Sequence, residues 1–296
     1  MALYRVSLFT GKVSRCLGRR EKVLRRYLEE GELILTTSYD DIWDKWDGST
    51  ISKQVEAHRS ARKRYLETLK KYLSVKVNPK VLEVGCGSSI DLHLLAEERE
   101  IEAYGVDISE TALEIAAGVS EYFNKKIHLS QGDAENLEFR DEMFEMVFSQ
   151  GLIEHFDDPL LVLKEQARVL KPGGILVVNV PQTYTVYTVY KHFMAKLGRW
   201  EWGEEKQFSA WLLEQMGKYL DLEMLEKCGY DYWRSPFEMV FSLRTLNNKI
   251  KKIPFIGRHL MNSSISRIWD ETWSKLEDKW GWAFMKNLVM VFRKPE

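Results

Sequence analysis

The chain has 296 residues, of which 45% are hydrophobic and 29% are charged, with 43 Lys and Arg against 44 Asp and Glu. A disordered chain carries far less apolar material, so this composition predicts a globular protein with a buried core. The formal net charge of −1 excludes a protein-wide basic field that would attract nucleic acid. We therefore expect no nucleic-acid partner.

The cysteines and the absence of apolar stretches predict a cytoplasmic location. Cys16, Cys86 and Cys228 stand far apart and form neither a CxxC pair nor a cluster with zinc-ligand spacing, as expected of reduced thiols. The opening residues lack the unbroken stretch of about 7 to 15 apolar residues that a signal peptide needs. No stretch reaches the roughly 18 apolar residues that span a bilayer.

Residues 1–76 predict a helical N-terminal cap, because apolar residues recur there at helical spacing. The clearest case is one long helix beginning near Lys53, whose apolar positions are Val55, Tyr65, Leu66, Leu69 and Leu73. Asn78 and Pro79 mark the end of this segment.

Residues 77–181 alternate short apolar runs with helical stretches, which predicts a parallel sheet covered by helices on both faces. Ser109 and Asp158 are typical helix starts, and Pro159 follows the second of them. The sequence Pro172–Gly174 predicts the end of a helix just before a strand.

After residue 181 the sequence becomes aromatic and polar. Residues 182–220 predict a helical lid inserted after the fifth strand, with Tyr184, Trp202 and Glu204 among its candidate substrate contacts. Residues 221–296 are expected to complete the core, first with a helix that stops at Gly229, then with a strand directly after it, and finally with a strand near the C-terminus. Within them, residues 239–269 contain six basic residues and no acidic one.

The run VLEVGCGSS indicates a ligand-binding turn, since it places Glu83, Gly85 and Gly87 at the end of the first buried strand. Glycine lets the backbone turn sharply and approach a ligand closely. A dinucleotide site would need a third glycine where this chain has Ile90. Asp107 ends the next strand, 20 residues after Gly87, at the spacing of a carboxylate that accepts hydrogen bonds from ribose.

Two further motifs follow the third and fourth strands. Asp133 and Ala134 offer a carboxylate and a backbone N–H that can read an adenine edge, and Ser149 and Gln150 end the fourth strand. Because the carboxyl ends of parallel strands border the ligand crevice of an open sheet, the four motifs together indicate a nucleoside site. The alternatives are a tight turn without a ligand at the glycines and a helix N-cap at Asp107.

The motifs VLEVGCG, GVDIS, GDAENL and LKPGGILVVNVP resemble those of the class I S-adenosylmethionine-dependent methyltransferases over roughly residues 81–181. The resemblance is greatest to the small-molecule branch that includes quinone-biosynthesis methyltransferases, where a pair like Glu154–His155 also follows the fourth strand. It implies an α/β fold with a Rossmann-like, seven-stranded, mostly parallel sheet whose last strand is antiparallel. The helical cap and the aromatic-rich lid would be additions to this core.

The resemblance also implies S-adenosyl-L-methionine as the cofactor and assigns residues to it. The glycine turn would contact the methionine end of the cofactor, and the acid that ends the second strand would bind the ribose. The motif after the third strand would contact the adenine, and the end of the fourth strand would border the methyl group. The residues so assigned are Glu83, Gly85, Cys86, Gly87, Asp107, Ile108, Asp133, Ala134, Ser149 and Gln150.

The acceptor side is predicted by fewer residues. His155 is a candidate general base, and the alternative is that it holds its loop by a backbone hydrogen bond. Tyr39, Tyr184, Trp202 and Glu204 are candidate lid or substrate residues, and the alternative is a place in the hinge or core.

We expect methyl transfer to an oxygen, or to a nitrogen or carbon, of a small, partly apolar acceptor, without a metal. The alternatives are a cofactor-binding or membrane-peripheral module without catalysis, and an NAD-dependent dehydrogenase. Residues 239–269 and the first 26 residues, with eight basic residues against Glu21, leave open either peripheral contact with anionic membrane or a solvated basic surface.

Overall fold

The structure is a computed structural model that describes residues 51–73, 77–196, 206–230 and 280–296, all within one compact unit. The predictions for Tyr39, Trp202, Glu204 and the basic segment 239–269 lie outside the described residues. Among the helices that the structure does describe, none is long and apolar enough to cross a membrane.

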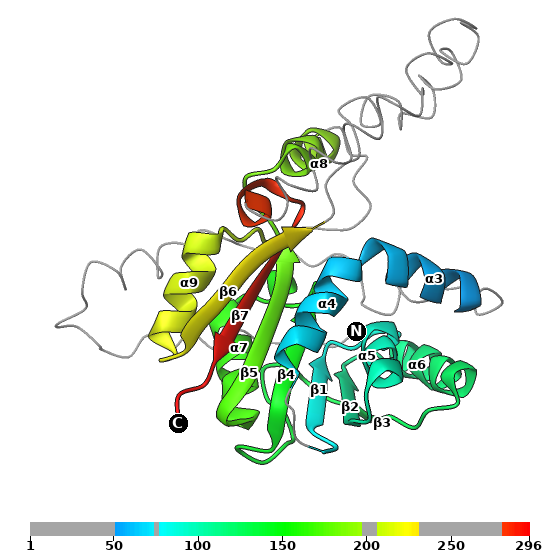
Figure 1. The fold of residues 1–296 in the computed structure, drawn as a ribbon. Coiled ribbons are helices and arrows are strands. Elements are labelled where there is room, and N and C mark those ends of the chain that lie inside the picture. The colour runs from blue at the N-terminus through cyan, green and yellow to red at the C-terminus, as the bar shows by residue number, and fades with distance from the viewer. Residues whose placement is uncertain (1–50, 74–76, 197–205, 231–279) are drawn as a thin grey trace, which may run out of the picture. The chain divides into compact units, whose positions relative to one another are not determined.

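One sheet of seven strands has the order β3-β2-β1-β4-β5-β7-β6 (Figure 1). The strands are β1 (Lys80–Val84), β2 (Glu102–Asp107), β3 (His128–Gln131), β4 (Phe144–Gln150), β5 (Leu170–Pro181), β6 (Glu223–Tyr230) and β7 (Asn287–Arg293). Strands β1 to β5 pair in parallel, whereas β7 runs antiparallel to both β5 and β6. The expected mostly parallel sheet with an antiparallel last strand is therefore confirmed.

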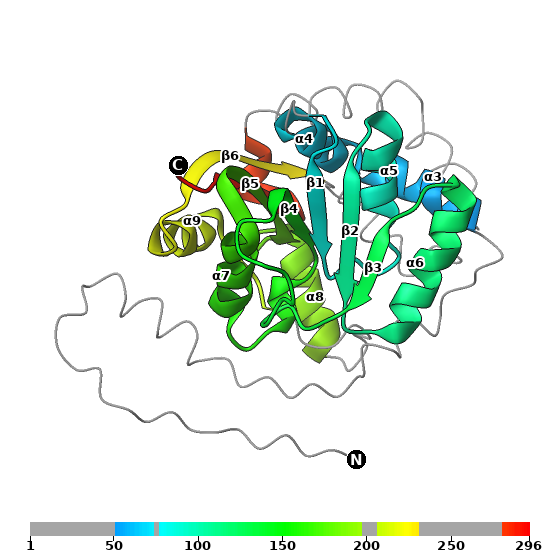
Figure 2. The same ribbon diagram turned by 90° about the horizontal axis from the view of Figure 1, so that it is seen from below.

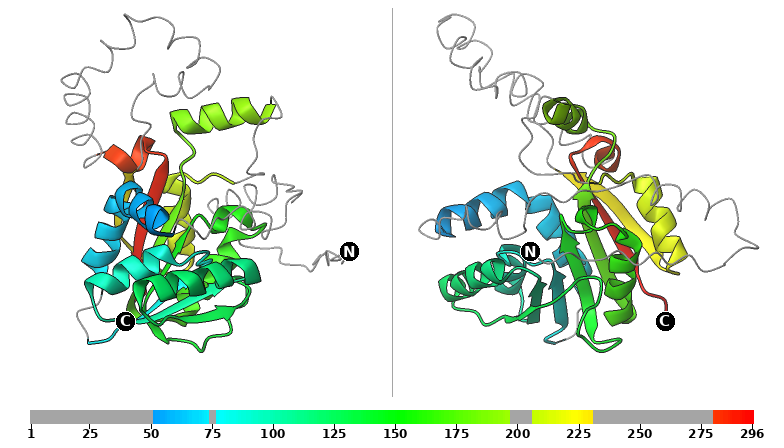
Figure 3. Two further views of the ribbon diagram at one scale, coloured as in Figure 1. Left: turned by 90° about the vertical axis from the view of Figure 1, so that its right-hand side faces the viewer. Right: turned by 180° about the vertical axis from the view of Figure 1, so that it is seen from behind.

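Helices cover both faces of this sheet, as expected (Figures 2 and 3). The helices that the structure describes are α3 (Ile51–Ala61), α4 (Lys63–Tyr72), α5 (Ile90–Glu98), α6 (Glu110–Phe123), α7 (Pro159–Val169), α8 (Val186–Lys196) and α9 (Ala210–Tyr219). Helix α8 lies beyond the ends of the strands (Figure 1). Helices α3 to α6 pack against one another on one face, while α7 packs on β4 and β5 and α9 on β6 and β7. Helix α9, from the segment predicted as a lid, thus contributes to the sheet's covering layer.

Two helix starts form as predicted. The Ser109 hydroxyl accepts the N–H of Ala112 at 3.1 Å, and the Asp158 carboxylate accepts the N–H of Leu160 at 3.0 Å. Each bond satisfies one of the backbone donors that the first turn of a helix leaves without an intrahelical partner. The first cap begins α6 directly after the end of β2, and the second begins α7 after the short segment that follows β4.

The long helix predicted within residues 1–76 is wrong in one respect, since it divides at Arg62. The backbone there departs from helical geometry (φ −111°, ψ 17°), and the Arg62 side chain pairs with Asp91 of α5. The predicted end of a helix at Pro172–Gly174 is also displaced. Helix α7 ends at Val169, and residues 172–174 form an irregular excursion in β5 between the pairs Leu170–Phe144 and Ile175–Met146.

The helix predicted to precede Gly229 is wrong, because β6 occupies that segment. Its polar residues fit a strand at the edge of the sheet, where polar side chains find partners or solvent. Glu226 accepts a hydrogen bond from the Tyr72 hydroxyl at 2.6 Å, and Lys227 lies 4.2 Å from the ring centroid of Trp282. Gly229 itself lies inside the strand, where a Cβ atom would lie 2.3 Å from the carbonyl oxygen of Gly281.

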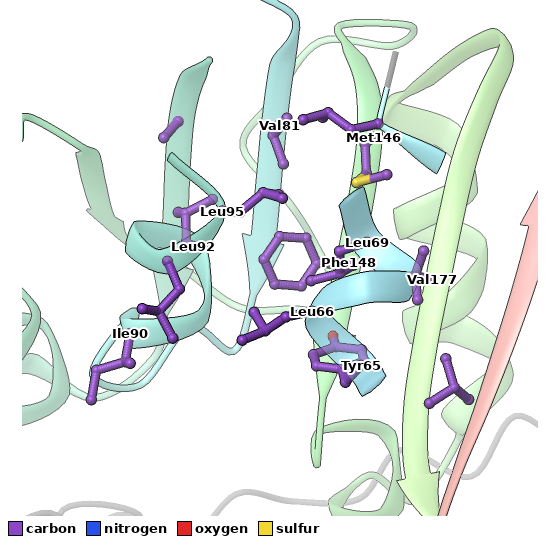
Figure 4. Packing of buried hydrophobic residues seen from close by; sticks show 14 of the residues in the cluster. Tyr65, Leu66, Leu69, Val81, Ile90, Leu92, Leu95, Met146, Phe148 and Val177 are labelled. Atoms are coloured by element: carbon purple, nitrogen blue, oxygen red, sulfur yellow. The ribbon is translucent and has the colours of Figure 1, made fainter. Parts of the chain in front are cut away.

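The core joins α4 and α5 to the centre of the sheet (Figure 4). All five apolar positions predicted from the helical spacing, Val55, Tyr65, Leu66, Leu69 and Leu73, are buried. The ring of Tyr65 stacks on Tyr230 with centroids 6.0 Å apart and meets the edge of Phe148 at 6.4 Å. This packing anchors the helix over the strands whose carboxyl ends carry the site.

We expect Gly217→Ala to destabilise the fold by about 1 to 3 kcal/mol through overpacking. Gly217 lies on α9, and an added Cβ would lie 2.3 Å from the buried ring of Phe292 in β7. Gly118→Ala on α6 is the matched control, because its Cβ would meet only Ile51 at 3.8 Å. The control should gain about 0.5 to 1 kcal/mol from helix propensity. Urea denaturation measures both, and equal stabilities would contradict the packing.

Candidate functional site

The carboxyl ends of β1 to β5 open into one cavity of about 530 Å³. Residues from α3, from the start of α5 and from the segment before β7 complete its wall. Nine residues predicted to bind the cofactor line it: Glu83, Gly85, Cys86, Gly87, Asp107, Ile108, Asp133, Ala134 and Gln150. His155 lines it as well.

Two predicted site residues do not line the cavity. Ser149 is buried, and its hydroxyl donates to Gln166 of α7 at 3.3 Å, so this side chain joins β4 to a helix. Tyr184 is 72% exposed, just before α8.

The turn between β1 and α5 forms a close backbone cradle. Gly85 and Gly87 have φ of +66° and +49°, in the left-handed region that favours glycine. A Cβ at Gly85 would lie 2.5 Å from Leu152, which lines the cavity. Ser89 is also left-handed, and the fully buried His93 ring lies 2.7 Å from the Ser89 carbonyl oxygen. The cradle therefore needs glycine at its closest approach and is held by a buried ring behind it.

Asp107 ties three segments together at the end of β2. Its carboxylate accepts the N–H of Gly87 at 2.8 Å and that of Ser109 at 3.0 Å. Its carbonyl oxygen accepts the N–H of Gly132 at 3.0 Å. These bonds bring the glycine turn, the start of α6 and the loop after β3 to one edge of the sheet.

The loop after β3 is held partly by its own acid. The Asp133 carboxylate accepts the N–H of Glu135 at 2.9 Å, and its carbonyl accepts the N–H of Asn136 at 3.0 Å. Ala134 is buried against the cavity, whereas Ile108, which also lines the cavity, is 51% exposed. A cavity wall with an apolar surface and backbone polar groups suits a flat heteroaromatic ring.

Three carboxyl groups lie buried in the wall of the cavity, those of Glu83, Asp91 and Glu154. Glu83 and Asp91 are 4% and 2% exposed, and Asp91 pairs with the Arg62 guanidinium. Burial and the charge of Asp91 raise the pKa of Glu83 well above its ordinary value. One carboxyl oxygen of Glu83 accepts no hydrogen bond from the described residues. The free oxygen of Glu83 can accept a hydrogen bond from a ligand, and a cation placed beside it would favour the ionised form of Glu83.

Three residues that no sequence motif indicated, His58, Arg62 and Asp91, also line the cavity. Burial and the neighbouring Arg62 lower the pKa of His58 to about 4, against a smaller opposing effect of Asp91. The imidazole is therefore neutral at pH 7, and its buried Nδ1 has no hydrogen-bond partner among the described residues. In the sequence, His58 and Arg62 could have been noticed as two polar residues four positions apart, beside the buried apolar positions of the same segment.

The segment after β4 forms the remaining wall. A short 3-10 helix (Ile153–His155) brings Leu152, His155 and Phe156 to the cavity, and the His155 N–H donates to the Leu152 carbonyl at 3.1 Å. Lys206 N–H donates to the Glu154 carbonyl at 3.0 Å, which joins this helix to the segment before α9. In the described part of the chain, no group of three or more His, Cys, Asp or Glu residues could hold a metal ion.

Comparisons with known proteins agree with this architecture. The family model described as "Methyltransferase domain" matches residues 82–178. The demethylmenaquinone methyltransferase of Staphylococcus haemolyticus is 31% identical over 199 residues, which cover 64% of this chain and 81% of that protein.

Solved structures share the fold at low sequence identity. A chain of the complex between the Haloferax volcanii Trm112 methyltransferase activator and a methyltransferase superposes with a TM-score of 0.58 at 19% identity, covering 88% of this chain and 98% of that one. Phosphoethanolamine N-methyltransferase 2 of Haemonchus contortus, in complex with S-adenosyl-L-methionine, gives a TM-score of 0.54 at 18% identity, covering 88% of this chain and 61% of that one.

The family match and the curated relative exclude the dehydrogenase interpretation and the interpretation as a module without catalysis. The chain belongs to the class I S-adenosylmethionine-dependent methyltransferases and transfers a methyl group from that cofactor to a small molecule.

Proposed function

We propose that this enzyme methylates an oxygen, or a nitrogen or carbon, of a small, partly apolar acceptor by in-line displacement. The observation that carries the proposal is that one cavity contains both the glycine turn and the apolar residues Leu152 and Phe156. Its volume of about 530 Å³ falls in the range of roughly 300 to 1,000 Å³ that is typical of small-ligand sites.

The residues of the cavity fit S-adenosylmethionine. The left-handed backbone at Gly85 favours glycine, and a Cβ there would press on the Leu152 side chain. Backbone so arranged can lie against the methionine end of the cofactor. The wall carries five carboxyl groups against Arg62 and Lys286, an acidic excess that favours a ligand with a sulfonium and an ammonium group. Asp107 would accept the ribose hydroxyls, and Asp133, Ala134 and Ile108 would hold the adenine.

When bound, S-adenosylmethionine supplies an activated methyl group whose sulfur is a good leaving group. The chain's own residues then have three tasks: to align the acceptor atom with the methyl group, to exclude water, and to receive a proton where the acceptor is a hydroxyl. Leu152 and Phe156 suit the second task. His155 is the proposed base. His58 is the second candidate, since it lines the same cavity and is unprotonated at pH 7, but its lowered pKa makes it a weaker base than an ordinary histidine.

The curated relative supports an acceptor with an aromatic ring, since its name states that it acts on demethylmenaquinone. A reduced quinone offers both a ring hydroxyl and an electron-rich ring carbon, which are acceptor atoms that the proposal includes. Quinols and phenols are therefore the first acceptors to assay.

Asp107→Ala should weaken S-adenosylmethionine binding by about 1 to 3 kcal/mol, because charge-assisted hydrogen bonds are lost. Part of this loss comes from the glycine turn, whose Gly87 N–H also loses its acceptor. Calorimetric titration measures the affinity, with Glu114→Ala on an exposed part of α6 as the control. An affinity unchanged in Asp107→Ala would contradict the placement of the ribose.

His155→Gln should reduce kcat with a quinol or phenol acceptor about 100- to 10,000-fold, which is the usual contribution of a general base. The assay follows methyl-labelled S-adenosylmethionine into extracted product, with wild type, His155→Gln and His58→Gln in parallel. A loss confined to His58→Gln would move the base to α3. Full activity of both variants would contradict a protein base.

We also propose that the basic segments make peripheral contact with anionic membrane. This proposal is supported by residues 239–269, which contain no Asp or Glu and in which basic and apolar residues alternate irregularly. The protein should float with vesicles containing phosphatidylserine at low salt and be released at high salt. Phosphatidylcholine vesicles and the variant Lys249→Glu, Lys251→Glu, Lys252→Glu are the controls. Absence of the wild-type protein from the anionic vesicle fraction would favour the solvated surface instead.

A further inference from the structure

The loop between β3 and β4 carries part of the cavity wall without regular secondary structure. Gly132, Asp133 and Ala134 line the cavity, while residues 132–143 form turns and a single isolated bridge. The start of the loop is fixed by the bond from the Gly132 N–H to Asp107. Its far end must be held in another way, because a loop fixed at one end cannot hold a ligand's edge in register.

The far half of the loop is bonded to α7. The Glu142 and Met143 N–H groups donate to backbone carbonyls of that helix at 3.1 and 2.8 Å, and the side chain of Arg168 bonds the residues before them. Its Nη1 donates to the Phe139 carbonyl at 2.8 Å and to the Asp141 carboxylate at 2.6 Å. Its Nη2 donates to the Leu137 carbonyl at 2.8 Å. A single guanidinium thus satisfies two backbone carbonyls and a carboxylate over five residues of the loop.

Glu165, one turn before Arg168 on the same helix, completes the arrangement. Its two oxygens accept Nε and Nη2 of Arg168 at 2.9 and 2.7 Å. One of them also accepts the N–H of Leu137 at 3.0 Å. The guanidinium is therefore fixed in orientation by a bidentate pair, and Leu137 is bonded through both its N–H and its carbonyl.

Helix α7, which carries both Glu165 and Arg168, is itself firmly held. Helix α7 is capped at Asp158, packs on β4 and β5, and ends where the Glu142 N–H donates to the Arg168 carbonyl at 3.1 Å. Arginine is needed because its planar fork can direct several N–H groups at once, whereas a lysine ammonium is a point charge on a flexible stem.

We propose that Arg168, oriented by Glu165, is a positioning residue that holds the loop of Gly132–Ala134 against the adenine of the cofactor. This inference rests on the proposed placement of the adenine at that loop. Arg168 acts through the backbone of Leu137 and Phe139 and touches no ligand itself. Loosening it moves the groups that distinguish adenine from another base, and leaves the methyl-transfer end of the cavity in place.

The test compares binding of S-adenosylhomocysteine with that of S-inosylhomocysteine, in which an oxo group replaces the adenine amino group. Calorimetry on the full chain gives the preference as the ratio of the two Kd values. Arg168→Lys should weaken S-adenosylhomocysteine binding about tenfold, as expected when charge-assisted hydrogen bonds are lost, and should weaken the inosine analogue less. The KM for S-adenosylmethionine should rise while kcat at saturation stays near that of wild type.

Arg140→Lys is the matched control, because Arg140 is an exposed arginine of the same loop. Glu165→Gln is the second variant should Arg168→Lys not fold, and it should reduce the preference by a smaller factor. Equal weakening of both ligands together with a lower Tm would overturn the positioning role. A wild-type preference that survives in Arg168→Lys would overturn it as well.

The wild-type result distinguishes this inference from the proposal beneath it. Tight binding of both ligands with no preference for adenine would contradict the placement of the adenine at Gly132–Ala134. A clear preference of the wild type for the adenine ligand supports that placement, and the Arg168 variants then test the positioning role of Arg168 alone.

Discussion

The site depends on the end of β2, where two residues receive backbone N–H groups from three other segments. The Val106 carbonyl accepts the N–H groups of Gly85 and Cys86 at 2.8 and 3.0 Å. Asp107 accepts Gly87 and Ser109 through its carboxylate and Gly132 through its carbonyl. Because these five donors converge on two residues, the glycine turn, the start of α6 and the loop after β3 keep a fixed geometry before any ligand binds, which reduces the ordering cost of binding.

Buried carboxyl groups in the cavity wall also prepare the site for a ligand, through electrostatics. Glu83 and Asp91 are nearly inaccessible to water, and Arg62 faces Asp91. Burying carboxylates is costly without compensating charge, and one guanidinium compensates only part of it, as the raised pKa of Glu83 indicates. A cationic ligand in the cavity would favour the ionised form of Glu83 and so lower its pKa again.

Much of the fold and the cofactor side could be predicted because the signals are local. Alternating apolar runs and helical stretches imply the parallel sheet, and a strand followed by Gly85 and Gly87 implies a turn whichever residues surround it. The prediction for β6 was wrong because a polar edge strand lacks the alternation of a half-buried one, and its partners Tyr72 and Trp282 come from distant segments. Ser149 shows the same limit, because the orientation of its side chain depends on Gln166 of α7.

The cavity residues that are proposed to face the acceptor could not be predicted from sequence motifs, because they come from separate segments of the chain. They are His58 from α3, Leu152 and Phe156 from the segment after β4, and Lys286 from just before β7. These residues share no motif, and α3 is held at this end of the sheet by its packing on α4, α5 and α6. The residues proposed for the cofactor follow strand ends that topology alone aligns, whereas those proposed for the acceptor depend on tertiary packing. Acceptor preference can therefore change through packing substitutions that leave the cofactor motifs intact.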